Sequence, residues 1–187
     1  MTAAKSPPGL ALLIVDVQDV FLRALPAAGT PLTRRCAFVA AAAQLLKIPT
    51  AITEQVPAKL GVTNTTVREA AGSKARVFAK SAFSAFGAEG LGEWLREQSA
   101  AHLLVAGLET PICVYLTVLD AIAEDFEATV LVDATGGRRP DDFPPVHRLL
   151  ESAGARLLPS ETVFYSILRD ATHPRFRDFT ALVKQYA

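Results

Sequence analysis

The sequence contains few residues of several kinds, and each shortage narrows what the protein can be. Its 187 residues include only 2 cysteines, 3 histidines and 1 tryptophan. The two cysteines, Cys36 and Cys113, fit a reducing compartment, where both stay free as core residues or as a nucleophile. No apolar run approaches the roughly 20 residues that span a bilayer, and the first residues lack the apolar segment of a secretory signal. We therefore expect a cytoplasmic protein with no membrane partner.

An excess of charge of either sign is also absent. The chain carries 19 basic and 19 acidic residues, and its formal net charge is zero. Such a chain has no field that attracts phosphate backbones, so we expect no nucleic-acid partner. Half of the residues are hydrophobic, at 50%. At this length they can bury a substantial core, and we expect residues 1–187 to form a single domain.

Short apolar runs alternate with helical patterns along the chain. The runs expected to form strands are Leu10–Val15, Thr50–Thr53, Ala75–Phe78, Leu103–Ala106, Thr129–Val132 and Ala155–Leu158. The segments expected to form helices are Leu32–Leu46, Leu91–Gln98, Pro111–Glu124, Phe143–Ser152, Ser160–Arg169 and Pro174–Tyr186. Because parallel neighbours need long crossovers, this alternation predicts an α/β, Rossmann-like protein. Its six-stranded, mostly parallel sheet would be doubly wound, with helices on both faces.

Reactive side chains stand where the predicted strands end. Asp16, Glu54 and Asp133 end the first, second and fifth strands, while Lys80 and Cys113 follow the third and fourth. Ligands of open α/β sheets bind beyond the carboxyl ends of the strands, so these residues mark one candidate edge. In the strand order 3-2-1-4-5-6, Asp16 and Cys113 follow neighbouring strands about 5 Å apart. The strand of Lys80 would lie two places from the first, and we expect a loop folding back across the edge to bring its amine in.

Cys113 has the sequence context of an activated thiol. Gly107 ends the fourth strand, and Thr110 and Pro111 resemble the N-cap and the first residue of a helix. Cys113 then lies partly exposed in the first turn, where free backbone N–H groups and the helix dipole favour a thiolate. The alternative role is that of a small buried apolar residue, which is what we expect of Cys36 in its alanine-rich helix.

The order and spacing of these motifs resemble the isochorismatase-like cysteine hydrolases, a family that includes nicotinamidases. The matching segments are Leu13-Ile-Val-Asp16-Val-Gln18, Thr53-Glu54-Gln55, Ala79-Lys80-Ser-Ala-Phe83-Ser84, Ala106-Gly-Leu-Glu-Thr-Pro-Ile-Cys113-Val, and Val132-Asp133-Ala134 leading to Arg138. The Thr-Glu-Gln segment with the following Pro57 and Leu60-Gly61 resembles the subgroup called isochorismatase domain-containing proteins. The resemblance covers nearly the whole chain and implies the isochorismatase-like hydrolase fold.

The resemblance implies a catalytic triad of Asp16, Lys80 and Cys113. Asp16 would be the general base that takes the thiol proton and later activates water, while the charge of Lys80 keeps Asp16 ionised. Cys113 would attack a small amide or related carbonyl compound and form a thioester. The family also implies an oxyanion hole made by the backbone N–H groups of Glu109 and Cys113, with a non-proline cis peptide before Glu109.

Four further side chains are candidates for substrate binding. Phe21 and Phe83 flank the motifs, where they either wall the pocket or belong to the core. Gln18 would orient a neighbouring backbone group, and Glu54 either binds a substrate amine or braces its loop. Asp133 is expected to be a structural carboxylate that binds local N–H groups.

The sequence departs from nicotinamidases at their metal site. Those enzymes bind a metal near the second strand through an aspartate and nearby histidines, whereas no histidine precedes His102 here. We therefore expect neither a metal nor a cofactor, and nicotinamide is disfavoured as substrate. Isochorismate is disfavoured as well, because its hydrolases have no cysteine at the position of Cys113.

The sequence thus favours a cysteine hydrolase acting on a small molecule. The alternative is a catalytically silent binding or scaffold protein that retains the fold, and neutral charge gives a macromolecular substrate no support. The last two predicted helices carry apolar residues that predict an exposed face and a homo-oligomer, a dimer or larger. These residues are Phe164, Tyr165, Ile167, Leu168, Phe176, Phe179 and Leu182.

Overall fold

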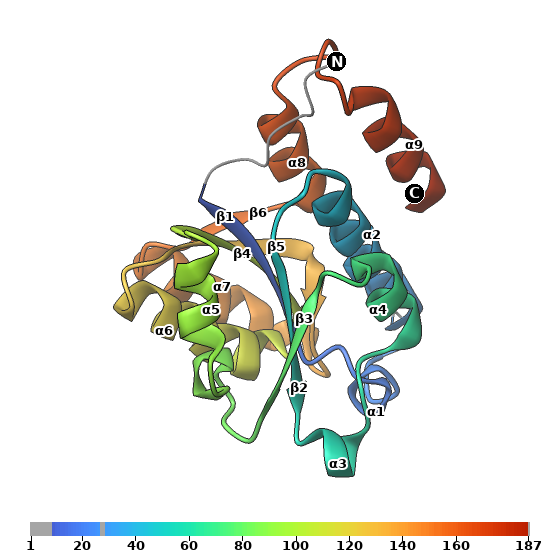
Figure 1. Ribbon diagram of the computed structural model, residues 1–187. Coiled ribbons are helices and arrows are strands. Elements are labelled where there is room, and N and C mark those ends of the chain that lie inside the picture. The colour runs from blue at the N-terminus through green and yellow to red at the C-terminus, as the bar shows by residue number, and fades with distance from the viewer. Residues whose placement is uncertain (1–8, 27–28, 187) are drawn as a thin grey trace.

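A parallel β-sheet runs through the centre of the molecule (Figure 1). The computed structural model describes residues 9–26 and 29–186. The expectation that the first residues form no secretory signal concerns a segment that lies outside the described residues. The strands are β1 (Leu10–Val15), β2 (Thr50–Gln55), β3 (Arg76–Lys80), β4 (His102–Leu108), β5 (Glu127–Gly136) and β6 (Arg156–Leu158). They follow the order β3-β2-β1-β4-β5-β6, and every neighbouring pair is parallel. The predicted sheet and its strand order are confirmed.

Helices cover both faces of this sheet. They are α1 (Asp19–Leu22), α2 (Gly29–Leu45), α3 (Pro57–Leu60), α4 (Thr65–Ala71), α5 (Leu91–Glu97), α6 (Tyr115–Ala123), α7 (Phe143–Ser152), α8 (Ser160–Leu168) and α9 (Phe176–Tyr186), with the short turns η1 (Ala85–Gly87), η2 (Thr110–Val114) and η3 (Pro140–Asp142). Helices α5, α6 and α7 lie on one face, and α2, α4, α8 and α9 lie on the other (Figure 1). Across the residues that the structure describes, no helix has the length and apolarity needed to cross a bilayer.

Two apolar layers flank the sheet because successive side chains of a strand point to opposite faces. Leu12 and Ile14 of β1 belong to the cluster beneath α2, whereas Leu13 and Val15 belong to the cluster beneath α5 and α6. All four are fully buried. A strand covered on both sides therefore reads as a continuous apolar run, as β1 does.

Gly107 lets the two central strands come close together at the edge where the reactive residues gather. It lies opposite Val15 in the β1–β4 register and has a φ of +117°. A Cβ atom at this position would stand 2.0 Å from the carbonyl oxygen of Val15. No residue with a side chain fits there, so the approach of β1 to β4 just before Asp16 requires glycine.

The structure extends several strands beyond their predicted ends. Strand β2 continues through Gln55, and β3 continues through Lys80. Polar residues ended the apolar pattern in the sequence, but their side chains find buried partners in the folded protein, and the ladder continues through them. Helix α4 was not predicted, although Asn64 caps it by accepting a hydrogen bond from the N–H of Thr66.

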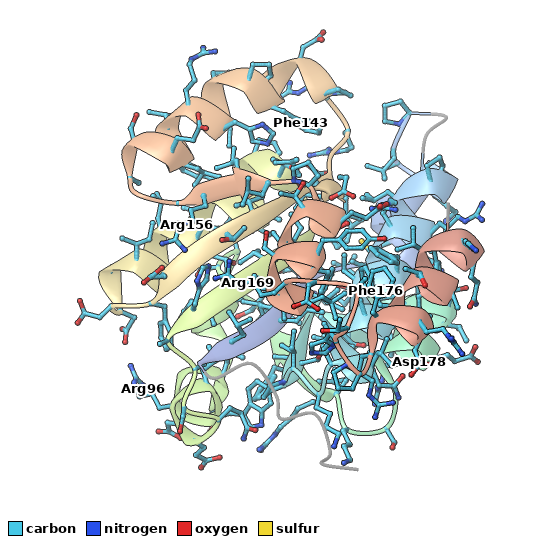
Figure 2. The ribbon with its side chains drawn as sticks, turned by 90° about the horizontal axis from the view of Figure 1, so that it is seen from above. Arg96, Phe143, Arg156, Arg169, Phe176 and Asp178 are labelled. Atoms are coloured by element: carbon cyan, nitrogen blue, oxygen red, sulfur yellow. The ribbon has the colours of Figure 1, made fainter. Side chains whose placement is uncertain are left out.

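The face of α8 and α9 that was expected to be exposed packs inside the chain instead. Phe164 and Phe179 are fully buried, and both rings lie about 6 Å from the ring of Phe38 on α2 (5.9–6.0 Å). Helices α8 and α9 lie beside α2 in both views (Figure 1, Figure 2). The prediction of an exposed apolar face was therefore wrong for most of these residues, because the two helices pack on α2, whereas Tyr165 remains 39% exposed. Self-association remains a prediction that this packing does not explain.

Candidate active site

A buried ion pair joins the ends of β1 and β3. The Nζ atom of Lys80 lies 2.6 Å from Oδ2 of Asp16, and neither side chain is more than 1% exposed. Lys80 is the last residue of β3 and stands opposite Gln55 of β2, so its side chain reaches Asp16 across the end of the intervening strand. The expectation that a loop must fold back to deliver this amine was wrong, because the length of the lysine side chain suffices.

The ammonium of Lys80 is surrounded by acceptors. Besides Asp16 it donates to Oε1 of Gln55 at 2.6 Å and to the carbonyl oxygens of Ala82 at 3.1 Å and Phe83 at 3.0 Å. An ammonium has three N–H donors, so four acceptors occupy it fully. Lys80 therefore fixes both the carboxylate of Asp16 and the loop that follows β3.

Asp16 is a buried carboxylate with an unusual backbone conformation. Its backbone has a φ of 52°, a left-handed conformation that residues other than glycine rarely adopt and that clusters at functional sites. The hydroxyl of Thr53 donates to Oδ1 at 2.8 Å, and the neighbouring thiol of Cys113 lowers the pKa of the carboxyl group. Burial raises the pKa of Asp16, while the charge of Lys80 opposes that rise. A carboxylate with a raised pKa is a stronger base than an exposed one.

Cys113 is a buried thiol in the turn η2. It is 8% exposed, and burial together with the negative charge of Asp16 raises the pKa of the thiol to about 12. The expectation of a partly exposed thiolate at rest was wrong, since the cost of burying a second negative charge beside Asp16 exceeds what the helix end supplies. The predicted cap was also misplaced. Glu109 precedes the turn, and the hydroxyl of Thr110 donates to the carbonyl oxygen of Gly136.

The backbone around Glu109 approaches the sulfur atom. The peptide bond between Leu108 and Glu109 is cis, as the family resemblance implied. A backbone hydrogen bond from Glu109 to Cys113 lowers the pKa of the thiol, although burial outweighs it. A backbone N–H group beside a nucleophile can stabilise the negative charge that develops on the oxygen of an attacked carbonyl group.

A cavity of about 320 Å³ opens beside these groups. Phe21 and Phe83 both line it, and Phe83 is 59% exposed, which places it at the mouth. The complete lining is Asp16, Val20, Phe21, Ala24, Gln55, Phe83, Leu108, Glu109, Ile112, Cys113 and Arg138. Lys80 is a predicted site residue that does not line the cavity. It lies behind the wall and is hydrogen-bonded to Asp16, which does line it.

Gln18 and Glu54 are not part of the cavity wall. The amide of Gln18 accepts from the backbone N–H of Gln55 at 2.7 Å and donates to the carbonyl oxygens of Gln55 and Gly61. Oε1 of Glu54 accepts from both the backbone N–H and the hydroxyl of Thr63, at 2.8 and 2.7 Å. Both side chains brace the segment after β2, so of the two alternatives for Glu54 the structure favours bracing.

Gln55 is the site residue that the sequence analysis missed. Side chains alternate along a strand, so Gln55 points to the same side of β2 as Thr53, which contacts Asp16, and Glu54 points to the other. The alternation of Thr53, Glu54 and Gln55 was available in the sequence and would have selected Gln55. Arg138 was noted only as the end of a motif, and the fold brings it to the cavity from beyond β5.

Asp133 has the structural role expected of it, but its partners are distant in sequence. Its carboxylate accepts from the backbone N–H and the hydroxyl of Ser160, both at 2.7 Å, and from the guanidinium of Arg35. These bonds hold the start of α8 against β5 and α2. They lower the pKa of Asp133 despite its partial burial.

The fold and this site define a class of α/β protein with a Cys-Asp-Lys cluster at the carboxyl edge of its sheet, and comparison with known proteins identifies the family. The Isochorismatase domain matches residues 10–162, so the chain belongs to the isochorismatase family. Isochorismatase domain-containing protein 2 of Bos taurus is 35% identical over 143 residues, which cover 76% of this chain and 68% of the relative. Isochorismatase domain-containing protein 2A of Mus musculus is 30% identical over 180 residues, covering 96% and 84%.

Solved structures share the same architecture. A Caenorhabditis elegans structure described as MAR1 ribonuclease is 27% identical, with a TM-score of 0.88 over 97% of this chain and 93% of that one. The Escherichia coli YcaC gene product, described as an octameric hydrolase of unknown specificity, is 20% identical with a TM-score of 0.81, covers 100% and 98% of the two chains, and shows the fold alone. Membership of the family supports a hydrolase-type function.

Proposed function

We propose that this protein is a cysteine hydrolase that cleaves small amides or related carbonyl compounds through a thioester on Cys113. The observation that supports this most directly is the grouping of three side chains at one cavity: Cys113 and Asp16 both line it, the two groups influence each other's pKa, and the carboxylate of Asp16 accepts a hydrogen bond from the ammonium of Lys80 at 2.6 Å. A nucleophile in contact with a base, and a base oriented by a third group, is the arrangement that nucleophilic catalysis requires.

The raised pKa of Cys113 determines how the first step would proceed. A thiol whose pKa is about 12 stays protonated at neutral pH, so Asp16 takes its proton while the sulfur attacks the carbonyl carbon. The electron pair of the broken carbonyl π bond moves to the oxygen, where the backbone N–H groups of Glu109 and Cys113 would stabilise the charge.

In the second half of the reaction, Asp16 acts first as a general acid and then again as a general base. When the tetrahedral intermediate collapses, the C–N bond breaks and Asp16 gives its proton to the departing amine, which leaves a thioester on Cys113. Asp16 then takes a proton from a water molecule that attacks the thioester. When the C–S bond breaks, Asp16 returns this proton to the sulfur, and the carboxylic acid product leaves. Lys80 transfers no proton in this scheme, because its three N–H groups hold Asp16, Gln55 and the loop after β3.

A ribonuclease function, suggested by the name of the C. elegans relative, has less support in this chain. Binding of RNA draws on several cationic side chains that contact phosphates. Here the formal net charge is zero, and the cationic side chain that lines the described cavity, Arg138, is paired with Glu109. A catalytically silent scaffold is the other alternative, and the same experiment separates all three.

The test compares ammonia release from a panel of small amides by wild type, Cys113→Ala and Cys36→Ala, with RNA cleavage measured in parallel. Cys36 is buried beneath the sheet and contacts the carbonyl oxygen of Ala134, so its variant is the matched control for a lost thiol. We expect amide hydrolysis by wild type and Cys36→Ala only, and mass spectrometry of the quenched reaction should show an acyl group on Cys113. RNA cleavage without amide hydrolysis, or hydrolysis by Cys113→Ala, would refute the proposal.

A further inference from the structure

Each charged side chain described in the cavity wall has a partner of opposite charge. Asp16 is neutralised by Lys80 behind the wall. Glu109 is neutralised by Arg138, whose Nε and Nη2 atoms lie 2.6 and 3.3 Å from the two carboxylate oxygens. The pair spans the rim, since the side chain of Glu109 is 10% exposed and that of Arg138 is 56% exposed. Each charged side chain that the structure describes in this wall therefore has a partner of opposite charge.

Apolar side chains form the rest of the wall. They come from the segment around α1, the loop after β3 and the residues that flank Glu109, and they are Val20, Phe21, Ala24, Phe83, Leu108 and Ile112. Among the lining residues that the structure describes, the uncharged polar side chains are Gln55, whose Oε1 accepts from Lys80, and the thiol of Cys113. A polar tail on a ligand would lose its water here and find few partners.

The cavity volume limits how much of a ligand can be enclosed. A water molecule takes a share of about 30 Å³ in the liquid. At a similar share for each non-hydrogen atom, 320 Å³ holds about ten such atoms. This is near the lower end of the volumes found for small-molecule pockets, about 300 to 1,000 Å³. One carbonyl group beside Cys113 leaves room for a short acyl chain or a single ring.

These observations lead to a substrate class, and this inference rests on the proposed function only for the placement of the carbonyl carbon at Cys113. We infer that the cavity takes an uncharged amide with a short apolar acyl group, and that the Glu109–Arg138 pair excludes amides that carry a carboxylate. A ligand carboxylate would have to share Arg138 with the carboxylate of Glu109, displace that carboxylate, or lie against apolar side chains. The first brings two like charges together, and the other two leave a charge without its partner.

The test measures binding to Cys113→Ala, so that it does not depend on turnover. Succinamate and 4-methylpentanamide have the same shape and differ by a carboxylate in place of an isopropyl group. We expect calorimetry or ligand-observed NMR to show that 4-methylpentanamide binds at least about tenfold more tightly. Equal or tighter binding of succinamate, or no binding of 4-methylpentanamide at tens of millimolar, would overturn the inference.

Two charge variants test the role of the ion pair itself. Glu109→Gln leaves Arg138 without its counterion, so the preference for the uncharged amide should fall by about tenfold or more. Arg138→Gln leaves Glu109 unpaired, so succinamate should bind still more weakly, and 4-aminobutanamide should gain on its uncharged isostere pentanamide. If neither variant shifts these ratios, the pair does not determine selectivity. The second variant keeps the test valid if the first one does not fold.

Hydrolysis measured on the protein with Cys113 intact separates this inference from the proposed function. Binding of 4-methylpentanamide without hydrolysis of any amide would refute the hydrolase function and leave the ligand class standing. Faster hydrolysis of succinamate than of 4-methylpentanamide would refute the ligand class and leave the function standing.

Discussion

Replacing Asp16 with asparagine should have opposite effects on hydrolysis and on alkylation of Cys113. In the resting protein the carboxylate of Asp16 helps to raise the pKa of the thiol to about 12, while Lys80 acts in the other direction. Asp16→Asn removes the negative charge and leaves the ammonium of Lys80 without its counterion. The pKa of Cys113 should therefore fall, and the thiolate should become more abundant at neutral pH.

The expected increase in the alkylation rate follows from two opposing effects. Each unit of fall in pKa increases the thiolate fraction tenfold but decreases its nucleophilicity by about threefold, so the net gain is about three- to fourfold per unit. A return from about 12 to the ordinary 9.0 would correspond to an increase of about 30- to 60-fold. Burial of the thiol persists in the variant, so we expect an increase of about tenfold.

The assay is the rate of carbamidomethylation of Cys113 by iodoacetamide near pH 8, followed by mass spectrometry. Cys36 is an internal control, because it is fully buried and its pKa is also raised to about 12. In the same variant, amide hydrolysis should fall by at least about a hundredfold, because the general base is lost. Slower alkylation of Asp16→Asn than of wild type would refute the reasoning, since Asp16 would then favour the thiolate at rest.

Four further predictions follow from the fold and the site. Gly107→Ala should lower the free energy of unfolding in urea by at least about 3 kcal/mol, because its Cβ would lie 2.0 Å from Val15 O; a soluble variant with wild-type stability would contradict the register. The lowered pKa of Asp133 means that its stabilising contribution is present above the unfolded pKa of about 3.9 and is lost as pH falls through the folded value. Asp133→Asn should therefore cost about 2 kcal/mol at neutral pH and flatten the loss of stability in acid, and an unchanged acid profile would count against this. Dialysis against a chelator should leave hydrolysis unchanged, because Lys80 and Thr63 already occupy the carboxylates of Asp16 and Glu54; restoration of lost activity by zinc or manganese would contradict it. Light scattering should give at least twice the monomer mass at micromolar concentration, and a monomer would disprove self-association.

The sequence alone determined the sheet and the edge at which the site lies. Apolar runs that are buried on both faces, separated by helical patterns, predict parallel strands with crossovers, and β1 and β4 follow that pattern. The ends of those strands then mark Asp16, Lys80 and Cys113, because parallel strands end at a common edge. These properties depend on periodicity and chain direction, which are local features of a sequence.

The tertiary structure decided the protonation of the thiol, the partners of the carboxylates and the surface that α9 covers. The pKa of Cys113 depends on how deeply the thiol is buried and on its contact with Asp16, two residues that are far apart in the chain. Likewise, Arg138 reaches Glu109 and α9 reaches α2 only through the assembled sheet. Desolvation and ion pairing depend on residues that the fold brings together from distant parts of the chain. The sequence pattern alone therefore does not predict which of the two effects is larger at a given residue.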